Sequence, residues 1–191
     1  MDDDRIRWNA RWRERGQGHP EPDPPSSLVT ARADLLPTRG RALDIAGGAG
    51  RHALWLARRG LDVTLVDISE VALDLAQRAA GQAGLPLHTL QRDLEREPLP
   101  EGPWDLILCF HYLQRSLFPR IPALLAPGGV FLIVHQTHGN LLRHERPSAR
   151  FLLADGELPT LVGLALREVH YEEGWLAEGR HEAVLLATNP P

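Results

Sequence analysis

The chain contains no lysine, because all 21 of its basic residues are arginine. Chemistry that depends on a lysine amine, such as a Schiff base or a phosphate-loop lysine, is therefore excluded. Its one cysteine, Cys109, cannot form an internal disulfide, and its apolar neighbours are typical of a buried thiol. No apolar run approaches the roughly 18 residues of a membrane span, and the acidic start at residues 1–4 lacks the basic region of a signal peptide. We expect a cytoplasmic protein with no membrane partner.

Excess positive charge is also lacking. The formal net charge is −4 at pH 7, so nothing in the overall charge attracts nucleic acid, and we expect no nucleic-acid partner. A chain of 191 residues, 43% of them hydrophobic, is long enough to bury one core. We expect a single domain over 1–191, as a monomer or homodimer. The arginine bias together with 16 prolines indicates a GC-rich, bacterial source.

The first 36 residues differ in composition from the rest and predict a helical lid or flap followed by a proline-rich linker. Residues 5–16 place Ile6, Trp8 and Trp12 among alternating charges, as in a short amphipathic helix. Residues 19–25 contain four prolines and cannot form a helix. Ser26 or Ser27 is expected to cap a further helix over 28–36.

From residue 40 to 187 the hydrophobic pattern alternates between strands and helices. Strands are predicted at 41–46, 62–66, 87–90, 105–110, 130–134, 165–171 and 181–187. Helices are predicted at 51–59, from Ser69 to about Gly81, near 117–125 and near 157–163, with a turn at 127–129. The pattern predicts an α/β fold of the Rossmann-like, doubly wound type. Its seven-stranded sheet is mostly parallel and closes with a C-terminal antiparallel hairpin, because the last two strands are joined by too few residues for a helical crossover.

Residues 41–52, Arg-Ala-Leu-Asp-Ile-Ala-Gly-Gly-Ala-Gly-Arg-His, are the most informative stretch. A strand, a glycine turn and a helix follow one another there, so a ligand can approach bare backbone and the free N–H groups of the helix. Asp44 lies within the end of the strand. Its carboxylate would repel a phosphate but would attract an ammonium group.

Two further acids follow the next two strands. Asp67 ends the second strand, where it can bind both hydroxyls of a ribose. Asp93 follows the third strand, where it can accept a hydrogen bond from an adenine amino group. The carboxyl ends of parallel strands share one edge of a sheet, so the three acids are predicted to line one rim. The alternative for each acid alone is a helix cap or a solvated loop residue.

These motifs resemble the class I methyltransferases that use S-adenosylmethionine. The resemblance runs over about residues 40–187: the glycine turn looks like the family's first motif, Val66-Asp67 like its ribose-binding acid and Gln91-Arg92-Asp93 like its adenine-side acid. It implies S-adenosyl-L-methionine as cofactor and S-adenosyl-L-homocysteine as product. Ala46 departs from the pattern, since the family usually has glycine there. The implied cofactor-binding residues are Asp44, Ala46, Gly47, Gly48, Gly50, Arg51, Asp67, Ile68, Asp93, Leu94 and Phe110.

Candidates for the methyl acceptor follow strands four and five. His111 and Tyr112 come after one strand and His135 after the next; each histidine is either a base or a structural group. Arg150 would clamp an anionic acceptor or lie in a solvated loop. These four residues, His111, Tyr112, His135 and Arg150, are the predicted catalytic set. His135 and His138 have the spacing of a metal pair, but no cysteine or glutamate lies close by and no metal is expected.

Within the family, the chain most resembles the tellurite-resistance and thiopurine-type enzymes, which implies a small-molecule acceptor such as a thiol, a chalcogen oxyanion or an amine. Two other functions stay open. Gly48, Gly50 and Ala53 match a weak dinucleotide fingerprint, which would make the chain a nicotinamide-dependent oxidoreductase. Alternatively, the chain binds the cofactor without catalysing transfer.

Overall fold

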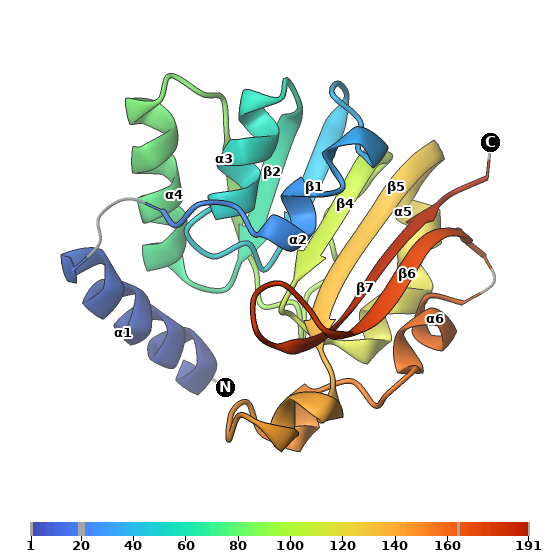
Figure 1. Ribbon diagram of the computed structural model, residues 1–191. Coiled ribbons are helices and arrows are strands. Elements are labelled where there is room, and N and C mark those ends of the chain that lie inside the picture. Colours follow the sequence, from blue (N-terminus) through green and yellow to red (C-terminus); the bar gives the residue numbers. More distant parts are fainter. Residues whose placement is uncertain (1, 19–21, 164, 191) are drawn as a thin grey trace. The chain divides into compact units, whose positions relative to one another are not determined.

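The computed structural model describes residues 2–18, 22–163 and 165–190 (Figure 1). Its seven strands form one sheet in the order β3-β2-β1-β4-β5-β7-β6. The pairs β1–β2, β2–β3 and β4–β5 are parallel, whereas β7 runs antiparallel to both β5 and β6. The predicted Rossmann-like α/β fold with a closing antiparallel hairpin is confirmed. No helix in these described ranges is long and apolar enough to cross a membrane.

The chain divides into two compact units, and the first comprises Met1–Ser26 and Pro37–Pro100. It contains the strands β1 (Arg41–Ile45), β2 (Asp62–Asp67) and β3 (His88–Gln91) and the helices α1 (Asp2–Gly18), α3 (Arg51–Arg58) and α4 (Glu70–Gln82). Ile45 pairs with Val66, and Asp67 pairs with Gln91. This register brings the carboxyl ends of the three strands to one edge, as the sequence predicts.

Small apolar residues pack the helices of this unit against its strands. The buried side chains of α4 include Ala72, Ala76 and Ala80, and those of α3 include Ala53 and Ala57. Alanine lets the helix axis approach the sheet closely and also has the highest helix propensity. Helix α4 begins at its predicted cap, because the Ser69 hydroxyl accepts a hydrogen bond from the Ala72 N–H at 3.1 Å.

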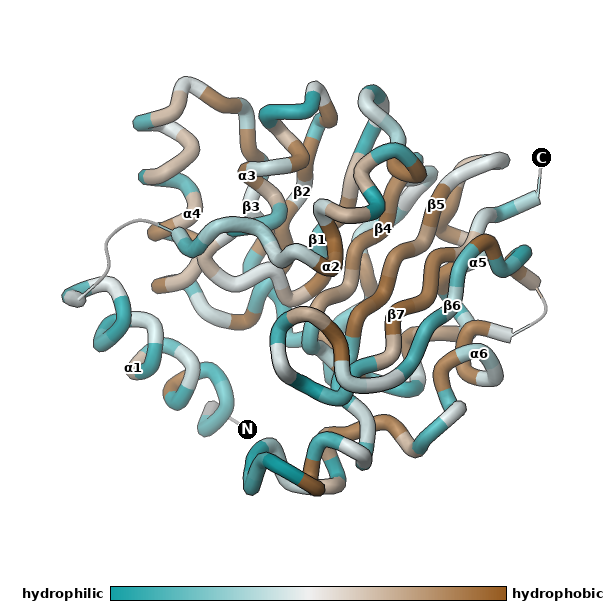
Figure 2. Tube along the Cα trace, in the orientation of Figure 1, coloured by the Kyte–Doolittle hydropathy of each residue, from teal (hydrophilic) through white to brown (hydrophobic). Residues whose placement is uncertain are grey.

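The second unit comprises Ser27–Leu36 and Glu101–Pro191. Its strands are β4 (Trp104–Phe110), β5 (Leu125–Gln136), β6 (Arg167–Trp175) and β7 (His181–Thr188). Its helices are α2 (Ser27–Thr30), α5 (Ile121–Leu124) and α6 (Glu157–Val162), with 3₁₀ turns η1 (Ala33–Leu35), η2 (Arg115–Arg120), η3 (His138–Leu142) and η4 (Ala149–Phe151). The β5 and β7 strands are hydrophobic along most of their length, while β6 is more polar (Figure 2). The core of this unit therefore lies around β5 and β7.

Two predicted helices are shorter than expected. The helix expected over 28–36 stops at Thr30, because the Arg32 guanidinium donates to the Leu28 carbonyl that the next helical N–H would have used. The segment expected to be helical near 117–125 is a 3₁₀ turn followed by one helical turn. Pro119 and Pro122 supply no N–H for a longer ladder.

The strand ends also differ in two places. The turn predicted at 127–129 lies inside β5 as a bulge, where the register jumps from the pair Trp104–Leu125 to the pair Leu106–Val130. Strand β6 continues through Glu172–Gly174, which the sequence assigned to the hairpin connection; the connection is 176–180. Of the predicted linker 19–25, residues 22–25 are irregular and residues 19–21 lie outside the described ranges.

Candidate functional site

The glycine turn joins β1 to α3 in the first unit, and backbone hydrogen bonds hold it. The N–H of Gly47 donates to the Val66 carbonyl of β2 at 3.2 Å, and the N–H of Gly50 donates to the Gly47 carbonyl at 3.0 Å. Ala46 occupies the left-handed region at φ 52°. This conformation is unfavourable for alanine, so having alanine instead of glycine at position 46 strains the backbone.

Asp44 lies beneath this turn and is fully buried. Neither of its carboxyl oxygens has a hydrogen-bond partner among the described residues. Burial raises the pKa of the Asp44 carboxyl to about 7, and the charge of Asp67 acts in the same direction. The backbone N–H of Ala53, close to the carboxyl but outside hydrogen-bond geometry, opposes the rise. Buried polar groups in folded proteins are almost always paired, so an orphaned carboxyl of this kind points to an absent ligand that carries a donor or a positive charge.

The backbone of the turn leaves no room for side chains. A Cβ atom on Gly47 would lie 2.6 Å from an Asp44 oxygen. Gly48 has a φ of 57°, and a Cβ atom there would lie 2.6 Å from the indole of Trp12. The two glycines are therefore required by what packs against them, and the turn presents bare backbone to a ligand.

Asp67 is connected to the same turn. Its Oδ2 accepts a hydrogen bond from the Gly48 N–H at 2.9 Å, and its Oδ1 accepts one from the Ser69 N–H at 2.9 Å. Burial raises the pKa of Asp67, and these N–H groups oppose the rise. Each oxygen keeps a second lone pair, so the carboxylate can accept hydrogen bonds from a vicinal diol such as a ribose.

The predicted residues around the third strand are more ordinary in their contacts. Asp93 accepts a hydrogen bond from the Glu95 N–H at 3.1 Å and lies 3.5 Å from Arg96, so its side chain caps the turn that follows β3. Leu94 is buried, and Ile68 is half-buried directly after Asp67. Arg51 begins α3, where its charge lowers the pKa of Asp44 in part.

Helix α1 docks on the first unit through a polar contact that the sequence did not reveal. Asn9 is buried; it accepts a hydrogen bond from the Ser69 hydroxyl at 2.6 Å and donates one to Glu70 at 2.7 Å. Arg5 also pairs with Glu70 at 3.2 Å. With Trp12 against Gly48, helix α1 covers the glycine turn. Helix α1 is predominantly hydrophilic (Figure 2), so the burial of Asn9 could not be read from its sequence.

In the second unit, His111 follows β4 in the left-handed region, at φ 58°. Its Nε2 lies 2.5 Å from the Oε1 of Glu182 on β7, and its ring lies 4.1 Å from that of Phe110. Glu182 is completely buried, and its other oxygen has no hydrogen-bond partner among the described residues. Sequence reasoning missed Glu182, although a lone acid at the start of the apolar run 183–187 was a usable sign. Tyr112 is half-buried next to His111, and its carbonyl accepts from the Cys109 thiol.

His135, at the end of β5, is buried and its Nε2 lies 2.8 Å from the Phe151 carbonyl. Burial lowers the pKa of His135 to about 4, so the ring is neutral at pH 7 and donates its Nε2 proton. Its ring lies 6.3 Å from that of His111. His138 instead faces the Ala149 carbonyl at 3.2 Å, and Arg150 is exposed over the Phe151 ring at 4.4 Å. The structure thus brings His111 and His135 together and places Arg150 at the surface.

An α/β sheet of this topology with a buried acid under a glycine turn and a second acid on the next strand is typical of proteins that bind a nucleoside cofactor. Comparison with known proteins points to a methyltransferase family. Residues 42–129 match the model of the methyltransferase domain. This match agrees with the class I methyltransferases that the motifs resemble and supports a relation to that family.

Curated relatives carry methyltransferase names. The chain is 33% identical to the tRNA 5-carboxymethoxyuridine methyltransferase of Escherichia coli, over 66% of this chain and 52% of the relative. It is 32% identical to the putative methyltransferase YqeM of Bacillus subtilis, over 53% of this chain and 45% of the relative. The chain thus spans about half the length of these relatives.

Solved structures share the fold at low identity. TehB from Haemophilus influenzae matches with a TM-score of 0.72 at 22% identity, over 92% of this chain and 65% of that one. The magnesium protoporphyrin IX methyltransferase of Synechocystis, solved with bound SAH, matches with a TM-score of 0.71 at 15% identity over 97% of both chains. These matches show that the chain shares the fold of these proteins, and the orphaned Asp44 carboxyl fits a ligand that carries an ammonium group.

Proposed function

We propose that this chain is a bacterial, cytoplasmic enzyme that transfers a methyl group from S-adenosylmethionine to a small-molecule nucleophile. The observation that carries the donor half of this proposal is the buried, unpartnered carboxyl of Asp44. The donor supplies an electrophilic methyl on a sulfonium, so the protein's own task is to bind it, align the acceptor and exclude water.

On the donor side, Asp44 would receive the ammonium of the cofactor, directly or through a water molecule. The turn from Ala46 through Gly47 and Gly48 to Gly50 would let its carboxylate approach bare backbone, and Arg51 begins the helix whose N-terminus favours a negative charge. Asp67 would accept the ribose hydroxyls, with Ile68 beside it. The adenine would lie by Asp93 and Leu94, and Phe110 completes the proposed cofactor set.

On the acceptor side, His111 would take the proton that the nucleophile loses. With its Nε2–H donated to Glu182, the Nδ1 of His111 carries the free lone pair of a base. Neutral His135 would accept a hydrogen bond at Nδ1, which has no partner among the described residues. Tyr112 and Arg150 would contact the acceptor. A thiol or oxyanion already ionised in water would need orientation alone.

The donor half is tested by calorimetric titration with S-adenosylhomocysteine. Wild type is expected to bind with one site per chain, and Asp67→Ala is expected to bind at least about tenfold more weakly, since a buried acceptor of two hydroxyls contributes more than about 1.4 kcal/mol. Equal affinity in a folded Asp67→Ala protein would refute the ribose assignment. NADH, titrated by its fluorescence, is expected not to bind. Binding of NADH would instead favour the alternative of a nicotinamide-dependent oxidoreductase.

The acceptor half is tested by incubating the protein with thiols, amines, phenols, tellurite and selenite and measuring S-adenosylhomocysteine release. Turnover with one of these classes, abolished in His111→Asn, is the expected result. Binding of S-adenosylhomocysteine without turnover on any acceptor would favour the non-catalytic binding module instead.

An RNA acceptor is the second candidate, because a 33% identical relative is named as a tRNA methyltransferase. Bulk tRNA from cells that lack this protein therefore belongs among the acceptors to be assayed, because such tRNA would not already carry the methyl group that the protein adds. The net charge of −4 argues for the small molecule, since phosphate contacts dominate the binding of nucleic acid. Methylation of tRNA alone would overturn the small-molecule proposal while leaving the donor half intact.

A further inference from the structure

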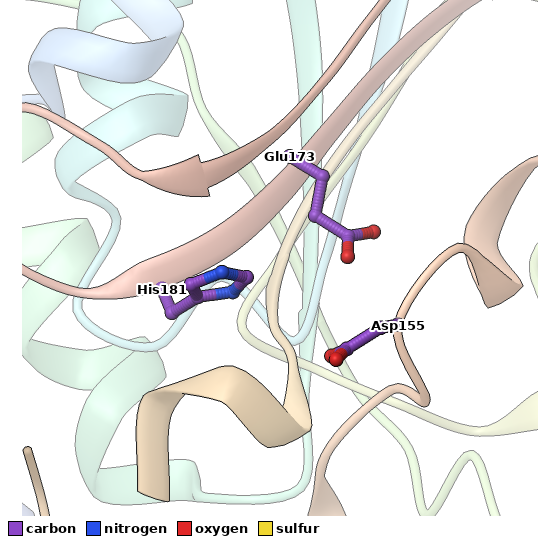
Figure 3. Close-up of side chains that lie close together, drawn as sticks. All are labelled: Asp155, Glu173 and His181. Carbon is purple, nitrogen blue, oxygen red and sulfur yellow. The ribbon is translucent and has the colours of Figure 1, made fainter. Parts of the chain in front are cut away.

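Three side chains of the second unit, distinct from the groups discussed above, converge on one point. Asp155 comes from the loop before α6, Glu173 from β6 and His181 from β7, and their ligand atoms lie within 4.8 Å of one another (Figure 3). Asp155 is exposed, and the other two are half-buried. We propose that these three residues bind a divalent transition-metal ion.

The ring of His181 is held in position for this task. Its Nδ1 lies 2.6 Å from the hydroxyl of Thr137, which is fully buried. The backbone of Gly139 also packs against this ring, so closely that a Cβ there would lie 2.7 Å from it. With Nδ1 engaged, Nε2 is the nitrogen left to bind a metal. Such a hydrogen bond on the opposite ring nitrogen is the usual companion of a metal-bound histidine.

Both carboxylates are oriented by neutral donors. Glu173 accepts hydrogen bonds from the Tyr171 hydroxyl and from the Gly156 N–H, the latter at 3.0 Å, and Asp155 accepts one from the Gly139 N–H at 3.3 Å. Neither carboxylate forms an ion pair with any described residue. The donors therefore fix the oxygens without neutralising them, and each carboxylate keeps lone pairs for a cation.

Two of the three side chains in the cluster are carboxylates, and like charges held this close repel one another. The nearby guanidinium of Arg143 lies over the Trp175 ring at 4.0 Å. A bound cation would relieve the repulsion between these acids.

The donor set indicates the class of metal. One imidazole with two carboxylates suits zinc, manganese, iron or cobalt, whereas calcium and magnesium take oxygen ligands alone. Zinc bonds to nitrogen and oxygen are about 2.0–2.2 Å long, so the three groups would draw closer on binding. Three protein ligands leave at least one position for water.

The proposal is tested by calorimetric titration of the metal-free protein with Zn²⁺ at pH 7.5, with Co²⁺ absorption reporting the coordination geometry. Wild type is expected to bind one equivalent. Asp155→Asn, Glu173→Gln and His181→Gln are each expected to weaken binding at least about tenfold, as is Thr137→Val, which acts through the orientation of His181.

His88→Gln is the matched control, because His88 and Asp62 form an exposed histidine–carboxylate pair 3.2 Å apart in the other unit. It should bind as wild type does. Circular dichroism checks the fold of every variant, and Zn²⁺ should raise the melting temperature of wild type but not of Asp155→Asn. Stoichiometric binding that survives in all three ligand variants, or no saturable binding in wild type, would overturn the proposal. Both outcomes are independent of methyl transfer.

Discussion

Asp44 shows how a single side chain can oppose stability in the free protein and favour binding. A carboxyl whose pKa is about 7 when folded and 3.8 when unfolded stabilises the fold only while it is protonated. As pH rises from about 4 to 7, the unfolded state releases its proton first and the fold loses stability. The ligand proposed for this site would restore the loss.

Asp44→Asn keeps the shape of the side chain and removes the charge. The variant without cofactor should exceed wild type in free energy of unfolding at pH 8, by at most ~4 kcal/mol, and the difference should shrink toward zero by pH 4. Urea unfolding at a series of pH values measures this difference. The same variant should bind S-adenosylhomocysteine more weakly. A pH-independent difference would contradict the burial of an unpaired carboxyl.

His135 acts in the opposite direction. Its pKa is about 4 in the fold and 6.5 in the unfolded chain, so its contribution is present above pH 6.5 and is lost as pH falls to 4. His135→Asn should cost about 1–3 kcal/mol at pH 8 through lost packing. The difference in free energy of unfolding between this variant and wild type should become smaller as the pH falls from 6.5 to 4. A deficit that stays constant from pH 8 to pH 4 would show that the ring is not desolvated.

Among the elements, helix α1 is connected to the proposed donor site through its side chains. Asn9 attaches it to the start of α4, and Trp12 packs against Gly48. The sequence predicted a helix carrying Trp8 and Trp12 as a lid or flap. We propose that α1 acts as a lid over the donor site, since Trp12 lies where the backbone of the turn is bare.

Trp12→Ala should therefore weaken S-adenosylhomocysteine binding about tenfold, chiefly through faster dissociation, because an aromatic wall of the site is lost. Stopped-flow displacement measures the dissociation rate. Trp8→Ala is the control on the same helix, since Trp8 is half-buried as Trp12 is, but the ring nearest to Gly48 is that of Trp12. Equal effects of the two substitutions would mean that α1 stabilises the fold without acting as a lid.

Local patterns identified most elements, and the exceptions have particular causes. Ser69 capped α4 as predicted, because an N-cap is decided within four residues. The helix predicted over 28–36 is shorter in the structure, because the Arg32 side chain donates a hydrogen bond to a backbone carbonyl within that segment. The same side chain pairs with Glu172 on a strand that is distant in the sequence. The partner of His111 and the companions of His181 were invisible for the same reason: Glu182, Asp155 and Glu173 meet them only through folding. The sequence analysis expected no metal because no cysteine or glutamate lies close to His135 and His138 along the chain. That argument considered sequence neighbours alone.

For the whole molecule, the donor site and the proposed metal site belong to different units. Each ligand should therefore leave its own trace in amide hydrogen exchange. S-adenosylhomocysteine should slow exchange across 46–54 and in α1, and Zn²⁺ should slow it at 137–140, 155–157 and 173–181. Mass spectrometry of peptic fragments resolves these segments. Protection by S-adenosylhomocysteine confined to β6 and β7 would refute the donor assignment.

The buried carboxyl beneath the glycine turn has a consequence for the lifetime of the protein in a cell. A chain that keeps an unpaired charge in its interior opens more readily when empty, and proteases cut the opened form. Filling the site closes it by mass action. The abundance of this protein would then follow the cellular supply of the methyl donor, so that the enzyme persists while its donor is plentiful and is degraded when the donor runs short.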